Sequence, residues 1–166
     1  AANDVAVMVS EGSGNWRCVS YVRADGIAVV VTAAASAAEV KTGTEAAKYV
    51  APSTLISHEG VVKAWITFNG ATGPPTIATS FNVDTGTGIT DNGTGDYTIP
   101  WDTNFSGENT YAIAGVARVP GDTTFAQVSP DATNGLEAAT VRINCVNNSN
   151  TATDCDIVTI IAIGDR

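Results

Sequence analysis

The chain has 166 residues, enough for one substantial domain preceded by a short module but too few for a large multi-domain enzyme. Only 15% of the residues are charged and the net charge is −9, so the clustered Lys and Arg that bind phosphate backbones are missing, and no nucleic-acid partner is expected. The longest apolar run, residues 157–163, is far shorter than the roughly 20 residues of a membrane-spanning helix, and we expect no membrane insertion. Frequent Gly, Thr, Ala, Asn and Val favour short strands joined by tight turns, which predicts an all-β protein.

Residues 1–33 alternate apolar and polar side chains in the manner of paired strands, with Val5, Val7 and Val9 on one face. The predicted strands cover residues 5–9, 16–22 and 27–32. So few strands bury little apolar surface by themselves, and we therefore interpret the segment as the end of a small β module. The chain begins with neither an initiator Met nor a secretion signal, and we expect it to continue a longer polypeptide.

Residues 34–60 change to an Ala-rich composition that predicts a connector of short helices. Ser36 and Glu39 have the spacing of a capping box, in which each side chain satisfies a backbone amide of the first turn, and Gly43 suits the end of that helix. Two further helical turns are predicted, over residues 45–50 after Thr44 and from Pro52 onward. Helices this short are not stable alone, so the connector must dock against the β domain or against neighbouring chains.

Residues 61–166 return to a period of two and predict an antiparallel β-sandwich, jelly-roll-like in type. Val62, Ala64, Ile66 and Phe68 share one face of the first strand, and Lys63, Trp65 and Thr67 share the other. This strand is expected to pair with the strand over residues 77–83. Asn92-Gly93 is a hairpin-type dipeptide. Further strands are predicted over residues 97–101, 111–119, 125–128, 137–146 and 156–163.

The last two of these strands are expected to form a hairpin, with apolar side chains on both faces of the final strand. One face would hold Val141, Ile143, Cys145, Ile157, Ile161 and Ile163, and the other Arg142, Asn144, Asp156, Val158 and Ile160. An apolar second face is expected to be covered by another element or another subunit. The candidate trimer contacts are therefore Trp65, Val158 and Ile160, although Trp65 is alternatively an exposed platform for stacking a sugar ring.

Three cysteines do not make a disulfide framework, and their spacing matches no zinc-binding or redox motif. Cys145 and Cys155 lie at equal distances from Asn150, so a hairpin centred there places them opposite each other. They either form a disulfide in an oxidising environment or remain two buried thiols, and the sequence favours neither.

Candidate side chains for catalysis or metal binding are few. His58 is the single histidine, and such a residue more often caps or hydrates a turn than acts in a catalytic triad. A calcium site built from Asp91, Asn92 and Asp96 is an alternative whose spacing does not match an EF-hand loop. We favour turn hydrogen bonds over paired catalytic carboxylates for the aspartates around the Gly-rich region, which are Asp84, Asp91, Asp96 and Asp102. We predict no enzyme, no metal and no cofactor.

Three parts of the chain together resemble a known family. Residues 12–26 resemble the closing strands of a small β module, and residues 38–55 resemble a connector of the form E-V-x-x-G-T … K-x-V-x-P-x-x-L. Residues 63–70, 80–83 and 89–98 resemble a C-terminal domain that many virion proteins share. The family is that of the tail-fibre and related structural proteins of tailed bacteriophages. This resemblance implies a homotrimeric, extracellular protein of the virion, and the family has no shared catalytic residues.

On this resemblance we expect a role in host attachment, in which the trimer presents loops to a bacterial surface glycan or protein and is joined through its N-terminal side to other virion proteins. The candidate contact residues, placed by turn composition, are Thr72, Asp91, Asn92, Thr94, Asp122, Asn148 and Asn150. Three copies multiply weak contacts through avidity, so no deep pocket is required. A capsid head fibre or decoration protein is one alternative. A polysaccharide depolymerase, recognisable by two close carboxylates in a groove between chains, is another.

Overall fold

The computed structural model of the chain describes residues 5–22, 33–43, 48–121 and 125–166. Contacts divide the chain into unit 1, Ala1–Ala34 with Ala47–Tyr49, and unit 2, Ala35–Ala46 with Val50–Arg166. The predicted strand over residues 27–32 lies outside the described residues, as do residues 45–47 of the predicted second helix, and residues 48–50 are not helical. Within the described residues, no helix has the length and apolar character needed to cross a membrane.

Unit 1 contains an antiparallel hairpin of β1 (Val5–Gly12) and β2 (Asn15–Val22), which confirms the first two predicted strands. Ser13 and Gly14 in the turn both adopt positive φ, a conformation that glycine reaches without steric penalty. The large apolar side chains of the hairpin are 43–63% exposed, and they are Val5, Val7, Met8, Val9, Trp16, Val19 and Tyr21. A two-stranded hairpin is at best marginally stable in water, so this apolar surface needs a cover.

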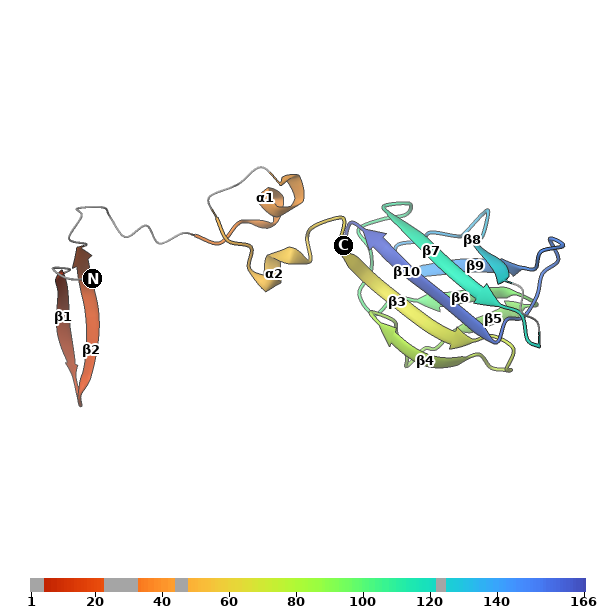
Figure 1. Cartoon of the computed structure of the whole chain (residues 1–166), viewed down its shortest axis with the longest axis horizontal. Coiled ribbons are helices and arrows are strands. Elements are labelled where there is room, and N and C mark those ends of the chain that lie inside the picture. The colour runs from red at the N-terminus through yellow and green to blue at the C-terminus, as the bar shows by residue number, and fades with distance from the viewer. Residues whose placement is uncertain (1–4, 23–32, 44–47, 122–124) are drawn as a thin grey trace. The chain divides into compact units, whose positions relative to one another are not determined.

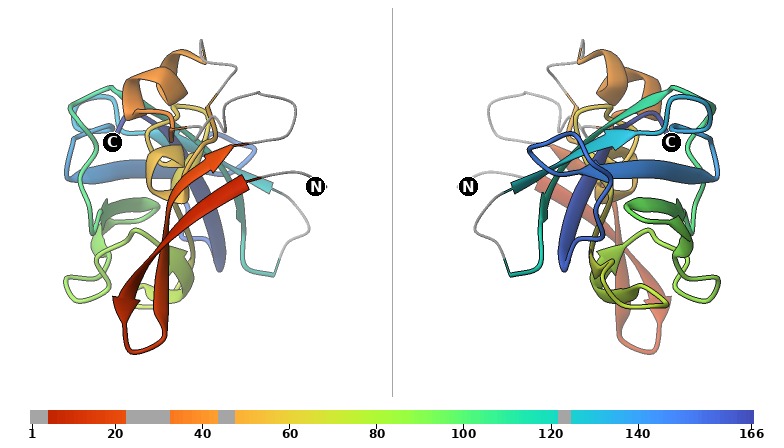
Figure 2. Two further views of the ribbon diagram at one scale, coloured as in Figure 1. Left: turned by 90° about the vertical axis from the view of Figure 1, so that its left-hand side faces the viewer. Right: turned by 90° about the vertical axis from the view of Figure 1, so that its right-hand side faces the viewer.

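Unit 2 is an all-β, sandwich-like domain, as predicted. Eight antiparallel strands form one curled sheet in the order β4-β3-β10-β7-β8-β9-β6-β5. The strands are β3 (Val62–Asn69), β4 (Thr76–Phe81), β5 (Thr90–Gly93), β6 (Asp96–Pro100), β7 (Tyr111–Arg118), β8 (Phe125–Pro130), β9 (Thr140–Val146) and β10 (Ile157–Gly164). In Figure 1, β4, β3, β10 and β7 form a first layer over a second layer that contains β9, β6 and β5. Figure 2 shows that β9 and β10, one from each layer, run in different directions.

The core lies between the two layers and consists of the alternating side chains of their inner faces. Phe68 from the first layer packs edge-on against Tyr97 from the second, with ring centroids 5.2 Å apart. Complete burial of a side chain of this kind stabilises the fold by about 1.5–3 kcal/mol, so the inner positions determine the register of the strands. All of the following inner residues are at most 1% exposed: Ala64, Ile66, Phe68, Tyr97, Ile99, Val141, Ile143, Cys145, Val158, Ile160 and Ala162.

The predicted hairpin of the last two strands is wrong. β9 pairs with β6 and β8, whereas β10 pairs with β3 and β7. Residues 147–156 therefore cross from the second layer to the first, and the alternation of β10 is set by its new neighbours. Val158 and Ile160 face the core, whereas Ile157, Ile161 and Ile163 face outward, the reverse of the expected arrangement.

The connector contributes α1 (Ala37–Thr42) and α2 (Pro52–Leu55) to unit 2. The predicted capping box is confirmed: the Glu39 amide donates to Ser36 Oγ at 3.3 Å, and the Ser36 amide donates to the Glu39 carboxylate at 2.8 Å. Gly43 ends α1 in the left-handed conformation, and Pro52 lies in the first turn of α2, as predicted. Both helices belong to unit 2, and contacts of Lys41 with Asp165 and of Lys63 with the His58 carbonyl join this part of the connector to its own β domain.

Candidate interaction surface

The outer face of the first layer is the side of β4, β3, β10 and β7 that points away from the core. Its large side chains are Val62, Trp65, Phe81, Val116, Ile157, Ile161 and Ile163. Six of these are 38–60% exposed, and Trp65 is half-buried. The wet face of a sheet carries mainly polar side chains, whereas on this outer face large apolar side chains predominate and threonines lie between them. It is therefore an apolar surface for which unit 2 provides no cover.

Strand register collects these side chains into rows across the sheet. Phe81 lies opposite Trp65, Trp65 opposite Ile161, and Ile161 opposite Ala114. The next row consists of Thr79, Thr67, Thr159 and Val116, and the Thr67 and Thr159 hydroxyls within it are 3.0 Å apart. Residues directly opposite each other have neighbouring side chains, so the apolar surface is continuous across four strands.

The outer face is almost without charge, although the chain has a net charge of −9. Among the outward positions of these four strands only Arg118 is charged, and it forms an ion pair with Asp156 at 2.7 Å where β10 begins. A shallow apolar depression on the face is lined by Ala114, Gly115, Val116, Thr159 and Ile161. A face of this chemistry suits contact with another protein surface better than contact with a polar small molecule.

Two of the three predicted trimer contacts need correction. Trp65 does lie on the outer face, but Val158 and Ile160 are fully buried in the core and are not available to another chain. Sequence reasoning also missed Phe81 and Val116, because their membership of the outer face depends on which strands pair with β3 and β10.

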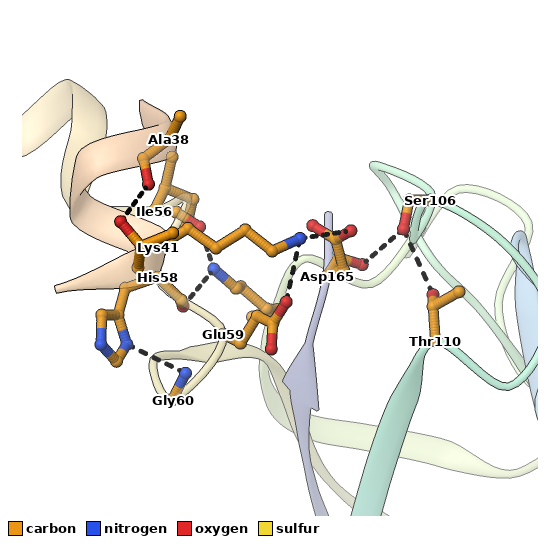
Figure 3. A network of polar contacts seen from close by, with 11 residues as sticks. Ala38, Lys41, Ile56, His58, Glu59, Gly60, Ser106, Thr110 and Asp165 are labelled. Atoms are coloured by element: carbon orange, nitrogen blue, oxygen red, sulfur yellow. Dashed lines mark hydrogen bonds and ion pairs between the residues drawn. The ribbon is translucent and has the colours of Figure 1, made fainter. Parts of the chain in front are cut away.

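The end of the domain next to the connector, called here the junction end, carries a polar network (Figure 3). The Lys41 ammonium from α1 lies 2.9 Å from the Glu59 carboxylate and 3.0 Å from that of Asp165. The Asp165 carbonyl accepts from the Ser106 amide at 3.2 Å, and Arg166 donates to the Lys63 carbonyl at 3.1 Å. Residues 165 and 166 thus join α1 to β3 and to the loop before β7.

Lys63 is fully buried, which is rare for lysine. Its ammonium donates to the backbone carbonyl of Ile56 and, at 2.8 Å, to that of His58, and so it holds the end of α2. Burial, and next repulsion from Arg166, lower the pKa of Lys63 below its ordinary value. A β-bulge between β3 and β10 turns both Lys63 and Ala64 inward. Strict alternation does not predict two successive inward residues, so the predicted faces of Val62 and Lys63 are wrong: Val62 points outward and Lys63 inward.

Replacement of Lys63 by Met keeps the aliphatic stem and removes its hydrogen bonds to α2. We expect Lys63→Met to lower the free energy of unfolding by about 2 kcal/mol, because a hydrogen bond from a charged donor contributes about 1.5–3 kcal/mol. Urea unfolding measures the loss, and limited proteolysis should show faster cleavage within residues 50–60. Lys41→Met, in the exposed part of the network, is the matched control and should leave both results nearly unchanged. Equal effects of the two substitutions would argue against this role of Lys63.

The opposite end of the domain, called here the distal end, is where β3 and β7 finish and β10 begins. The hydroxyl of the buried Tyr97 lies 3.1 Å from the Gly70 carbonyl oxygen and 2.9 Å from the Asp154 carboxylate. Asp154 also accepts from the Gly95 amide at 2.7 Å. Burial, and next the hydrogen bond to Asp154, raise the pKa of Tyr97, so it remains a protonated donor. These contacts tie together the loops at residues 70–75, 94–95 and 147–154.

Most candidate contact residues lie at this distal end. Thr72, Thr94, Asn148 and Asn150 belong to the three tied loops, Asp91 and Asn92 lie on β5 beside the turn, and all six are exposed. Asp122 lies outside the described residues. The turn between β5 and β6 falls on Thr94-Gly95 and not on Asn92-Gly93, because Gly95 adopts positive φ and a Cβ there would be 2.5 Å from the Cys145 carbonyl oxygen.

The aspartates around the Gly-rich region serve local structure. Asp84 and Asp91 accept from backbone amides two residues ahead, each at 2.9 Å. Asp96 forms a two-pronged ion pair with Arg142 at 2.6 and 2.9 Å, which removes it from the suggested calcium site. His58 Nδ1 accepts from a backbone amide at 3.0 Å. In the described part of the chain, no group of three His, Cys, Asp or Glu is placed to hold a metal ion.

A polar cavity of about 190 Å³ lies at the junction end, and Glu108, Asp131 and Glu137 are among its lining residues. The Asp131 carboxylate accepts from the amides of Thr133 and Asn134 at 3.0 and 3.1 Å. These two hydrogen bonds, and next one from Asn144, lower the pKa of Asp131 to about 2. Asp131 is therefore ionised at neutral pH and unsuited to donate a proton to a substrate in this cavity.

We expect acid to destabilise the fold through Asp131 and Asp96. The pKa of each is lowered in the folded chain, by backbone amides for Asp131 and by Arg142 for Asp96, whereas an unfolded Asp titrates near pH ~3.9. Their stabilisation is complete above about pH 4 and is lost as the pH falls through the lowered pKa values, of which that of Asp131 is about 2. The urea midpoint should fall over this range, and Asp131→Asn should make the fall shallower. Glu108→Gln, on the neighbouring loop, is the control, and an equal flattening by both would contradict the assignment.

Cys145 and Cys155 are fully buried thiols and do not form a disulfide in this structure. They do not face each other across a hairpin, because β9 and β10 lie in different layers. The crossing segment nevertheless brings both into the same core cluster, where the Cys155 thiol donates to the Thr153 carbonyl at 3.6 Å. The Thr153 amide donates to the Cys145 carbonyl at 3.0 Å, which holds the returning chain beside β9.

Comparisons with models of known protein families, with curated proteins and with solved structures find no match to this chain. The surfaces of its two ends and its outer face are therefore the basis for assigning a function.

Proposed function

We propose that this chain is a fibre-type structural protein of a tailed bacteriophage, which assembles as a homotrimer in the virion and attaches to the surface of the host cell. The observation that carries the proposal is the exposed, apolar and nearly uncharged outer face of β4, β3, β10 and β7. Contiguous apolar surface of this kind marks sites of protein contact. The resemblance of residues 12–26, 38–55, 63–70, 80–83 and 89–98 to phage fibre proteins supports the class of protein and the trimeric state.

The size of the outer face supports contact between copies. Its six large side chains are 38–60% exposed and, with the small residues between them, extend across all four strands, as a protein contact requires. Because Arg118 is the single charge among its outward positions, copies of this acidic chain can approach there without strong repulsion. The β1–β2 hairpin, apolar and exposed, offers a second surface for the same association.

The two ends of unit 2 support attachment. The connector docks at the junction end through Lys41 and Lys63, and the exposed loops gather at the distal end. A module held at one end and presenting loops at the other suits recognition of a surface. The contacts of Tyr97 and Asp154 hold these loops in place before binding, which reduces the ordering entropy lost on contact. Three linked copies then multiply weak contacts.

Attachment is tested with the full chain carrying a fluorescent label and a panel of bacterial strains, scored by flow cytometry. On a strain that binds, Thr94→Arg adds a large charged side chain to the exposed distal turn and should reduce the cell-bound signal about tenfold, equivalent to about 1.4 kcal/mol. Ala132→Arg, exposed at the junction end, is the matched control and should bind as the unchanged chain does. Equal losses from both variants, or no loss from either, would argue against attachment through the distal end.

A further inference from the structure

Cys145 and Cys155 stand where the chain leaves the second layer and enters the first. Cys145 lies near the end of β9 and Cys155 just before β10, and both side chains are 0% exposed. Both belong to the same core cluster, and the amide of Thr153, two residues before Cys155, donates to the Cys145 carbonyl at 3.0 Å. The residues between the two cysteines include the exposed distal loop, which a bond between the two sulfurs would close.

We propose that Cys145 and Cys155 form a cross-linking site, at which a low-molecular-weight disulfide of the oxidised-glutathione type converts the two thiols to a disulfide that locks the distal loop of residues 147–154. The proposal goes beyond attachment and self-association, since it depends on the geometry of a single copy of unit 2. The sequence alone leaves a disulfide and two buried thiols as alternatives, and it predicts a hairpin for the two cysteines that the structure does not contain.

The reaction consists of two thiol–disulfide exchanges. In the first, the Cys155 sulfur attacks as thiolate one sulfur of oxidised glutathione, whose S–S bond breaks, and the departing glutathione thiolate takes up the proton that Cys155 lost. In the second, the Cys145 sulfur loses its proton and attacks the Cys155 sulfur of the mixed disulfide, and the second glutathione leaves and is protonated. Two protein thiols are oxidised to one disulfide, and one glutathione disulfide is reduced to two thiols.

The surroundings of the two thiols indicate which thiol attacks first and how fast the exchange proceeds. Burial raises the pKa of both thiols, that of Cys145 to about 12, and interaction with Cys145 opposes the rise at Cys155, so Cys155 is the thiol that attacks first. Burial also keeps the oxidant away from both sulfurs. The folded chain should therefore react slowly, through transient opening of the loop at residues 147–154, and remain in the thiol form under reducing conditions.

The test uses the full chain with Cys18→Ala, because Cys18 is exposed and could react by itself. The chain is incubated with oxidised glutathione near pH ~8, unfolded in acid, alkylated and weighed by mass spectrometry. We expect a product without alkylation, lighter than the reduced chain by about 2 Da for the two hydrogens removed. Its melting temperature should rise by about 5–10 °C relative to the reduced chain, because the closed loop restricts the unfolded state.

Cys18→Ala combined with Cys155→Ala is the control, and its melting temperature should not depend on the oxidant. If that variant does not fold, digestion of the oxidised Cys18→Ala chain still decides the matter, since the peptides carrying Cys145 and Cys155 must be joined. Two thiols that stay open to alkylation after prolonged oxidation would overturn the proposal. A stable glutathione adduct on either cysteine would overturn it as well.

Discussion

Ile161→Asp is expected to convert the proposed homotrimer into a monomer while leaving the chain folded. Ile161 lies in the middle of the outer face, between Trp65 and Ala114, and is 41% exposed in a single copy. A carboxylate there costs a single copy at most about 1 kcal/mol in strand preference. Between copies it would be buried without a partner, which costs several kcal/mol and weakens association by about 100-fold or more. Light scattering measures the mass, and circular dichroism checks that the fold is kept.

Ala71→Asp is the matched control for this change. Ala71 is exposed in the loop after β3 and lies off the outer face, so the same new charge should leave the mass of the assembly unchanged. Loss of association in both variants would indicate a general effect of added negative charge. If Ile161→Asp still associates, the outer face is not the surface through which copies contact one another.

Ile160→Asp, one position earlier on the same strand, is expected to abolish folding. Ile160 is 0% exposed and lies opposite Ile66 and Gly115, so an aspartate there would bury a carboxylate with no partner. The cost exceeds about 5 kcal/mol, a large part of the stability of a domain. The milder Ile160→Ala should lower the free energy of unfolding by about 2–5 kcal/mol in urea titration.

Ile160→Asp and Ile161→Asp test the two faces of β10 separately. If the sequence-based arrangement were right, Ile160→Asp would dissociate copies and Ile161→Asp would unfold the chain. The structure predicts the opposite outcome at both positions. A folded, monomeric Ile160→Asp chain would contradict the core as it is described here.

Features that depend on local sequence could be predicted. The Ser36–Glu39 capping box, the end of α1 at Gly43 and the start of α2 at Pro52 each depend on residues within one turn of a helix. The inner face of β3 could be predicted as well, because Ala64, Ile66 and Phe68 alternate with larger or more polar neighbours. Together with the frequent turns, these patterns were enough for the all-β, sandwich-like class.

Features that depend on distant partners could not be predicted. β10 is apolar at nearly every position, so its sequence carries little information on which alternate residues face the core. The inward turn of Lys63 results from a bulge whose position depends on pairing between β3 and β10. The hydrogen bond that joins Tyr97 to Asp154 spans 57 residues and has no local signal. The outer face and the tied distal loops thus become visible through the structure.

The central claim, that copies of this chain cover one another through the outer face, is tested most directly by multi-angle light scattering of the purified full chain over a range of concentrations. We expect a mass of three times the 16.9 kDa of one chain, and a fall to the mass of one chain in Ile161→Asp. A mass of one chain at every concentration up to about 100 µM, where even weak association is populated, would contradict it.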